Sequence, residues 1–96
     1  MNTPEIKHLD ESQLAYYPFT KKEVLKSKPE IFIRRFDLER AQQLGNLYRH
    51  SVSIHFKNTK DETVIVNGSV WALTEDFVQL KGSMSIPIRS IERVIV

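Results

Sequence analysis

The spacing of the apolar residues changes at His50, and this change constrains the fold more than any other feature of the sequence. Before His50 apolar residues recur every three or four positions, as in a helix, and after it they alternate, as in half-buried strands. With 96 residues, the chain has the size of one domain. We therefore predict an α+β domain over residues 20–96. Two short N-terminal helices (about 20–45) would pack on a strongly bent, five-stranded antiparallel barrel (about 50–96), after a partly extended arm (1–19).

A capping signal predicts that the first helix begins at Thr20. In Thr20-Lys21-Lys22-Glu23 a threonine is followed three residues later by a glutamate, which is the pattern of a capping box. Phe19 and Val24 stand at the two positions that form a hydrophobic staple around such a cap. This helix should be short, because Pro29 disfavours helical geometry at the residue before it.

A second capping signal predicts a longer helix. Ser27 and Glu30 repeat the spacing of the capping box, and Pro29 between them suits the first turn of a helix. We expect this helix to run from about Pro29 to Leu44, with Gly45 as its left-handed C-cap.

The second predicted helix has an apolar side with one charged residue in it. At about 100° per residue, five apolar residues share this side, which should face the core: Phe32, Ile33, Phe36, Leu44 and Leu47. Arg40 falls near the middle of the same side. It could bury its stem and pair with Asp37, or it could meet an acidic partner or another subunit. Ile31 and Leu38 lie on the opposite side.

Five strands are expected after His50, at residues 52–57, 63–73, 77–81, 84–88 and 92–96. Gly68 lies inside the second strand, where an isolated glycine indicates a bulge or a sharp bend. Gly82-Ser83 fits a two-residue hairpin. One tight turn at Arg89-Ser90-Ile91 precedes the last strand.

This order of elements is that of the SH3-like small barrels, and a preceding helix is a feature of the Sm-like variant. Residues 49–96 resemble the bacterial Sm-like RNA chaperone family Hfq and its relatives. Val52-Ser53-Ile54-His55-Phe56 is similar to the first strand of that family. Asn67-Gly68-Ser69-Val70, followed by Phe77-Val78-Gln79-Leu80, is similar to its first motif, and residues 86–94 are similar to its closing motif. The resemblance implies an Sm-like barrel over about half of the chain.

The sequence departs from this family at two places. Hfq proteins bind uridine-rich RNA through a Lys-His pair in the closing motif, where this chain has Ile88 and Arg89. Sm rings form by strand pairing between subunits, and Pro87 in the fourth strand has no N–H to donate. We therefore expect neither a regular ring nor RNA binding of the Hfq type.

The whole chain also resembles a small uncharacterised family of bacterial proteins. The resemblance is carried by Tyr17-Pro18-Phe19-Thr20, Arg34-Arg35-Phe36 and Leu44-Gly45-Asn46. It implies no function.

Composition excludes several kinds of chemistry. The chain has no cysteine, which excludes disulfides, a thiol nucleophile, iron–sulfur sites and cysteine-containing zinc sites. His8, His50 and His55 do not have the spacing of metal ligands, and Glu75 and Asp76 are adjacent carboxylates in a turn. We therefore expect no enzyme, no catalytic or metal-binding residue, no cofactor and no small-molecule substrate.

The sequence also gives an expectation about location. No apolar run reaches the length of a membrane span, and the N-terminal residues do not have the pattern of a secretory signal. We expect a cytoplasmic protein that makes no membrane contact.

The charge is uneven although the net charge is only +2. Residues 20–50 hold eight basic and four acidic residues, whereas residues 51–96 are neutral. Seven basic side chains of the first segment are therefore candidate contacts to the phosphates of RNA or DNA: Lys21, Lys22, Lys26, Lys28, Arg34, Arg35 and Arg49.

A second hypothesis starts from apolar residues that point away from the barrel interior. These residues form a candidate interaction surface together with Arg40: Ile65, Trp71, Leu73, Phe77 and Ile95. The predicted helices could cover part of this surface. The sequence therefore favours a non-catalytic binding module that makes protein–protein contacts or self-associates, with RNA binding through the basic segment as the alternative.

Overall fold

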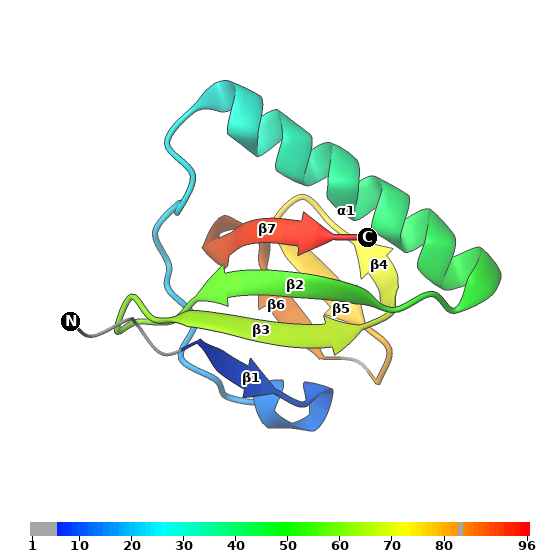
Figure 1. The fold of residues 1–96 in the computed structure, drawn as a ribbon, viewed down its shortest axis with the longest axis horizontal. Helices are drawn as coiled ribbons and strands as arrows, with labels where there is room; N and C mark the ends of the chain where they lie inside the picture. The colour runs from blue at the N-terminus through cyan, green and yellow to red at the C-terminus, as the bar shows by residue number, and fades with distance from the viewer. Residues whose placement is uncertain (1–5, 83) are drawn as a thin grey trace.

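The computed structural model describes residues 6–82 and 84–96, which form one α-helix, seven strands and two short 3₁₀ helices (Figure 1). In chain order the elements are β1 (Lys7–Leu9), the 3₁₀ helix η1 (Glu11–Leu14), α1 (Lys28–Tyr48), β2 (Val52–Lys57), β3 (Thr63–Gly68), β4 (Val70–Leu73), β5 (Phe77–Leu80), β6 (Ser85–Pro87), the 3₁₀ helix η2 (Ile88–Ser90) and β7 (Ile91–Ile95). The predicted α+β class is confirmed. The two helices on a five-stranded barrel are not found.

The strands form two sheets. The first has the order β1-β3-β2-β7, with β1 and β3 parallel and the other pairs antiparallel, and the second is the antiparallel sheet β4-β5-β6. The predicted strand 63–73 leaves the first sheet after Gly68 and enters the second at Val70, so the expected break near Gly68 is confirmed. Among the described residues β6 pairs only with β5 and β7 only with β2. The sheets therefore do not close into the predicted barrel.

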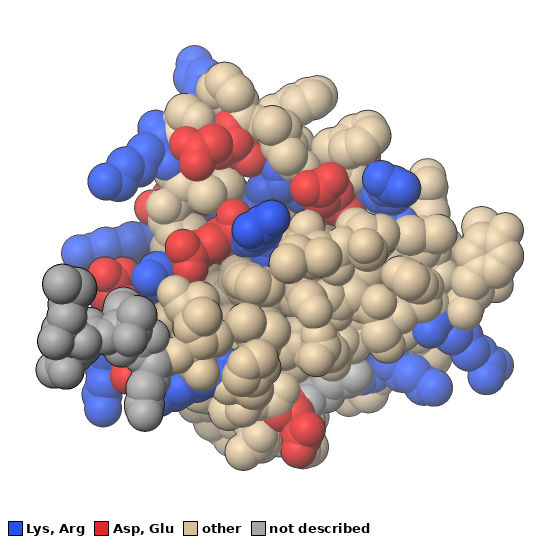
Figure 2. All heavy atoms as spheres, in the orientation of Figure 1, with Lys and Arg blue, Asp and Glu red and all other residues tan. Residues whose placement is uncertain are grey.

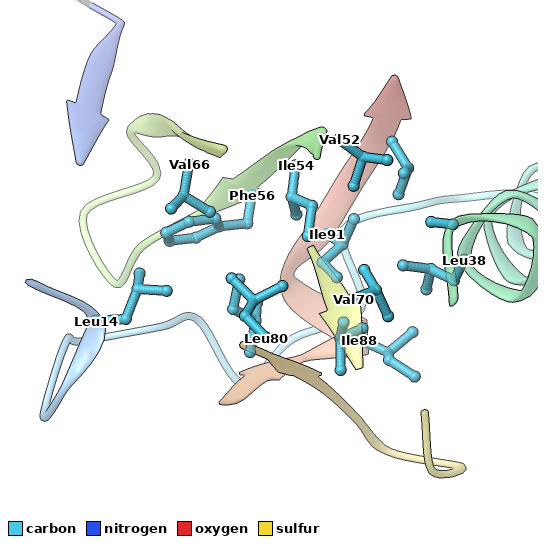
Figure 3. Packing of buried hydrophobic residues seen from close by; sticks show 14 of the residues in the cluster. Leu14, Leu38, Val52, Ile54, Phe56, Val66, Val70, Leu80, Ile88 and Ile91 are labelled. Carbon is cyan, nitrogen blue, oxygen red and sulfur yellow. The ribbon is translucent and has the colours of Figure 1, made fainter. Parts of the chain in front are cut away.

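The hydrophobic core lies between the two sheets (Figure 3). Alternate residues of β2 point inward, as the sequence predicted, and Ile54 and Phe56 are fully buried. Val70 and Leu80 meet them from the second sheet. η1 adds Leu14 and α1 adds Leu38, which close the two open sides of the core.

The arm of residues 1–19 is more ordered than expected where it is described. β1 adds a parallel edge strand to β3, with His8 opposite Ile65. Leu14 then enters the core from η1 and is only 3% exposed. The sequence missed both elements because each is too short to show a period.

The helix predicted to begin at Thr20 is absent, and residues 20–26 contain no regular element. Their backbone groups bond to β2 and η2 instead: the Thr20 N–H donates to the Lys57 carbonyl at 3.1 Å and the Val24 N–H to the Arg89 carbonyl at 3.0 Å. Tertiary hydrogen bonds thus replace the capping box, whose local contribution is small.

The second helix begins where the sequence predicted. The Ser27 side chain accepts a hydrogen bond from the Glu30 N–H at 3.3 Å and donates one to the Glu30 carboxylate at 2.7 Å. Its predicted end is wrong, because α1 continues to Tyr48 and the left-handed cap is Arg49, with φ 54°. Gly45 lies inside the helix, where α1 crosses β4.

The predicted inner side of this helix is also wrong. The residues of α1 that are buried are Arg34, Leu38, Ala41 and Gly45. A Cβ at Gly45 would collide with the Val70 carbonyl oxygen and lie 3.1 Å from its nitrogen. The backbones come too close at this crossing for a larger side chain. Of the residues predicted on the inner side, Phe32, Ile33, Phe36 and Leu47 are exposed together with Arg40, and Leu44 is half-buried.

Within the described residues, no helix combines the length and the apolar character that are needed to cross a bilayer.

Candidate interaction surface

Arg34 is the charged member of the inner face of α1. Its guanidinium donates to both carboxylate oxygens of Glu23, each at 2.6 Å, and to the carbonyl oxygen of Ile91 at 3.0 Å. Burial alone would raise the pKa of Glu23, but the Arg34 guanidinium and the N–H groups of Leu25 and Val24 hold it below its ordinary value. Arg34 is 5% exposed. It therefore ties α1 to β7 and to the segment before the helix, and it offers no surface for an RNA phosphate.

The opposite face of α1 carries large apolar side chains that are exposed. Phe32 is 72% exposed, Phe36 and Ile33 are each 58% exposed, and Leu47 is 72% exposed. Ile33, Phe36, Arg40, Gln43 and Leu47 follow one another along this side of the helix at alternating steps of three and four residues. We call these five residues the outer stripe. Phe32 and Tyr48 flank it near its two ends.

The outer stripe loses its charged neighbours toward the C-terminal end of α1. Residues 41–48 contain no charged side chain. Figure 2 shows acidic and basic side chains over the N-terminal part of α1 and at the left ends of the strands, and mostly uncharged residues over the centre and right of this face. Between Arg40 and Arg49 the stripe thus has no charged neighbour on α1.

A groove of ≈470 Å³ runs between α1 and β7. Ile33, Asp37 and Arg40 line it from the helix, and Ile95 lines it from the strand. Charged residues make up more than half of its lining, so the groove separates the apolar side chains of α1 from Ile95: Glu30, Arg34, Asp37, Arg40, Glu92 and Arg93. Two residues of the predicted interaction surface, Arg40 and Ile95, meet here.

The other residues of the predicted interaction surface are spread over both sheets. Ile65 is half-buried on β3 of the first sheet. In the second sheet Leu73 packs partly against the core, whereas Trp71 is 52% exposed and Phe77 47% exposed. α1 contacts β4 but leaves Trp71 open to solvent. These residues do not form one patch with Ile95.

Phe77 lies in a second groove, of ≈650 Å³. Tyr17, Phe19 and Pro87 share its walls with Phe77, and Lys21 is also among the lining residues. The rings of Tyr17 and Phe19 are 5.5 Å apart and meet edge to face. Phe19 was predicted to form a staple at the start of a helix, and neither Tyr17 nor Phe19 was predicted to line a groove.

The seven candidate nucleic-acid contacts are not brought together. Lys21, Lys22, Lys26 and Lys28 are exposed and lie along the segment that leads into α1. Arg35 bonds the Glu39 carboxylate at 3.3 Å and the Thr74 carbonyl at 2.8 Å. Arg49 caps the far end of α1, about 30 Å along the helix from Lys28. Four lysines remain as one basic segment.

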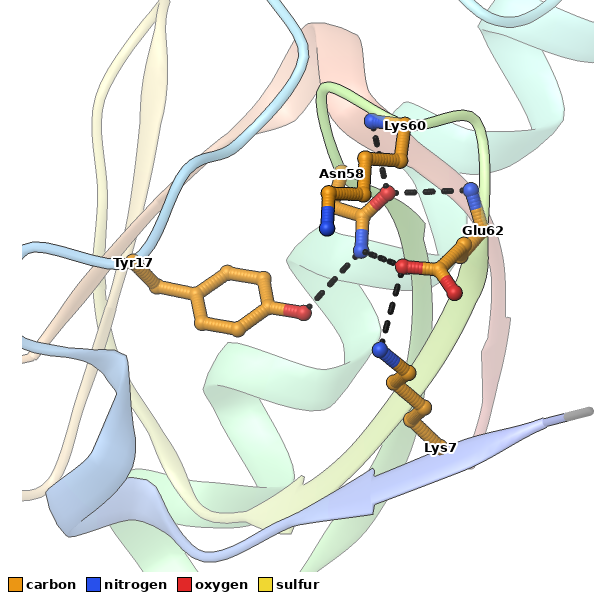
Figure 4. Close-up of polar contacts among 5 residues, drawn as sticks. All are labelled: Lys7, Tyr17, Asn58, Lys60 and Glu62. Carbon is orange, nitrogen blue, oxygen red and sulfur yellow. Dashed lines mark hydrogen bonds and ion pairs between the residues drawn. The ribbon is translucent and has the colours of Figure 1, made fainter.

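The buried side chain of Asn58 organises the turn between β2 and β3 (Figure 4). Its amide nitrogen donates to the Tyr17 hydroxyl at 3.2 Å and to the Glu62 carboxylate at 3.0 Å, and its oxygen accepts from the N–H groups of Lys60 and Glu62. The bonds from Asn58 and Lys7 lower the pKa of Glu62. Both polar atoms of the Asn58 side chain are thus used inside the fold, which indicates a structural role.

His55 lies in a row across the first sheet. It is opposite Ile65 on one side and Arg93 on the other, and His8 follows beyond Ile65. Burial and the nearby Arg93 charge lower the pKa of His55, against a smaller opposing effect of Glu92. In the part of the chain that is described, no three acidic or histidine side chains gather as metal ligands would.

Comparison with known proteins gives no matching family model, and no match among curated proteins or solved structures.

Proposed function

We propose that this chain is a non-catalytic protein-interaction module and that the outer stripe of α1 is its contact surface. The observation that carries the proposal is the division of α1 into two faces. Leu38 and Ala41 on the inner face are completely buried, so the fold needs nothing further from this helix. Phe32, Phe36 and Leu47 remain exposed on the other face.

The size of the exposed apolar surface supports this proposal. An aromatic side chain carries about 200 Å². At exposures of 72%, 58% and 74%, Phe32, Phe36 and Tyr48 together present about 400 Å² to solvent. Ile33 and Leu47 add to this area, which brings it to the upper part of the range of about 300–600 Å² for the largest apolar patch of a monomer, and such patches are often functional.

Polar groups beside and within the stripe agree with the same function. Asp37 and Arg40 line the groove beside Ile33. Interfaces commonly have an apolar centre with a polar rim, in which arginine and aromatic residues are enriched.

Photo-crosslinking in the cells that naturally produce the chain tests this proposal. A photoreactive phenylalanine analogue at position 36 should give discrete crosslinked products with protein. The same analogue at Lys60, which is exposed on the β2–β3 turn, is the matched control and should give none of them. Failure to crosslink at position 36, or the same products from both positions, would contradict the proposed function.

RNA binding is the second candidate function, and the exposure of four lysines between residues 21 and 28 favours it. Each phosphate that is neutralised should contribute about 0.7 to the salt dependence of binding to a single strand. Fluorescence anisotropy with labelled single-stranded RNA at low salt measures this. Replacing Lys22 and Lys26 by glutamine should weaken binding, and a wild-type chain that does not bind at micromolar concentration removes this candidate.

A further inference from the structure

We propose that the partner of the outer stripe is a second copy of this chain, with two α1 helices packed antiparallel about a two-fold axis. This inference rests on the proposed function and names its partner. It commits to a symmetric contact, in which the same residues of each copy meet.

The spacing of the outer stripe is that of a helix–helix seam. Ile33, Arg40 and Leu47 are seven residues apart, and Phe36 and Gln43 fall between them at the second apolar position of each heptad. Such a repeat keeps one side of a helix facing a neighbouring helix. No such helix is present among the described residues.

The side chains of the stripe select the antiparallel arrangement. A parallel pair would place Arg40 against Arg40 of the second copy, which is a repulsive contact. An antiparallel pair can place Phe36 against Leu47 and Arg40 against Gln43. Because of the two-fold symmetry, each of these contacts occurs twice in the dimer.

This register pairs apolar side chains with apolar ones and polar side chains with polar ones. Apolar side chains meet apolar ones at both ends, and each Arg40 guanidinium faces an amide oxygen that can accept its hydrogen bond. The antiparallel arrangement also opposes the two helix dipoles. The other register that engages most of the stripe would set Phe36 against Arg40 and Ile33 against Gln43, which leaves Leu47 outside the seam.

The seam covers less area than a standard-size interface, which buries about 800 Å² on each partner. In this register the two helices overlap over residues 35–48, so Phe32 and Ile33 lie outside the seam. Phe36 and Tyr48 present about 260 Å² between them. Arg40, Gln43 and Leu47 supply further area, which fits a dimer that forms as the concentration rises.

Sedimentation velocity over a concentration series tests the pairing. The wild-type chain should pass from monomer to dimer as its concentration rises. Phe36→Glu and Leu47→Glu should each raise the dissociation constant of the dimer about 30-fold or more, because each places a charge in the apolar contacts of the seam. Tyr16→Glu replaces another exposed aromatic outside the stripe, and should leave the dissociation constant unchanged. A wild-type monomer at every concentration, or a dimer that Phe36→Glu does not weaken, would overturn the inference.

Disulfide crosslinking tests the relative orientation of the two α1 helices. Because the native chain has no cysteine, only the introduced thiols can react. An oxidised mixture of the Phe36→Cys and Leu47→Cys variants should give a covalent dimer faster than either variant alone. Faster crosslinking of Phe36→Cys with itself would contradict the antiparallel register.

The two experiments separate this inference from the proposed function. If the chain stays monomeric while the photoreactive group at position 36 captures a different protein, the second copy is excluded and the interaction module stands. If the chain stays monomeric and nothing is captured at position 36, both proposals fail.

Discussion

The two faces of α1 differ in a way that is unusual for a helix on a sheet. The inner face packs on the sheets with Leu38, Ala41 and Gly45, together with the ion pair of Arg34. The outer face holds Phe32 and Phe36 in contact with solvent. Amphipathic helices ordinarily bury their most apolar side.

Close approach of the two backbones, rather than total hydrophobicity, orients this helix. The Val70 backbone comes so near to Gly45 that the crossing accepts only a glycine. A helix turned to bury Phe36 would have to stand further from β4. The remaining apolar side chains are then available to another molecule.

The largest expected effect comes from two leucines of the same helix. Leu38→Ala removes a completely buried side chain and should lower the free energy of unfolding by about 2–5 kcal/mol. Leu47→Ala should change it by less than about 0.5 kcal/mol in the dilute monomer, because that side chain is 72% exposed. Urea unfolding measures both. Similar effects of the two substitutions would contradict the assignment of the faces.

Gly45→Ala should destabilise the protein although alanine favours helices. The added methyl group meets the Val70 backbone, which cannot move aside as the end of a side chain can. Overpacking of this kind costs about 1–3 kcal/mol. This cost should exceed the gain of about 1 kcal/mol in helix propensity. Gln43→Ala on the outer face is the control and should be neutral or slightly stabilising. Thermal unfolding that shows Gly45→Ala to be the more stable protein would refute the close approach.

Glu23→Gln should destabilise the fold by about 1–3 kcal/mol at neutral pH, because it leaves the buried Arg34 without its countercharge. The pKa of Glu23 is lowered in the folded state, so the carboxylate stabilises the protein fully above about pH 4.5 and loses this effect as the pH falls through the lowered pKa. Urea titrations at several pH values should therefore show the wild type approaching the variant under acid conditions.

The exposed pair of Arg35 and Glu39 provides a control for this ion pair. Glu39→Gln should cost no more than about 0.5 kcal/mol, because both side chains of that pair are screened by solvent. An equal loss in Glu39→Gln and Glu23→Gln would show that burial of Arg34 adds nothing.

The smallest expected effect concerns the exposed face of the first sheet. Burial and Arg93 lower the pKa of His55, so the folded state binds a proton less readily than the unfolded state. Stability should therefore decline slightly as the pH falls below about 6.5 and level off below the lowered pKa. NMR titration should show that Arg93→Gln raises the pKa of His55, whereas Arg40→Gln on α1 leaves it unchanged.

The strands after His50 were predictable because apolar and polar residues alternate along them, whereas β1 is too short to show this pattern. The strand 52–57 and the break near Gly68 both follow from local pattern. The absence of the helix predicted at Thr20 could not be read from the sequence. Thr20 and Glu23 bond to Lys57 and Arg34, which lie further along the chain. The open sheets were missed for a similar reason, since barrel closure depends on pairing between the outermost strands.

The exposure of apolar residues could be predicted from the sequence only in part. Outward apolar residues were expected on the barrel, and Trp71, Phe77 and Ile95 are indeed about half exposed. The larger exposed surface lies on α1, in residues that hydrophobicity alone assigned to the core. The spacing of Leu38, Ala41 and Gly45 was the signal that could have identified the true inner face, because small residues on one side of a helix permit close packing.

Thiol labelling tests the orientation of α1 most directly, because the native chain has no cysteine. In dilute solution Leu47→Cys should react with a maleimide nearly as fast as an unfolded control, and Leu38→Cys should react only through unfolding. At concentrations where the dimer forms, labelling of Leu47→Cys should slow down. Fast labelling of Leu38→Cys together with protection of Leu47→Cys in the dilute monomer would contradict the arrangement described here.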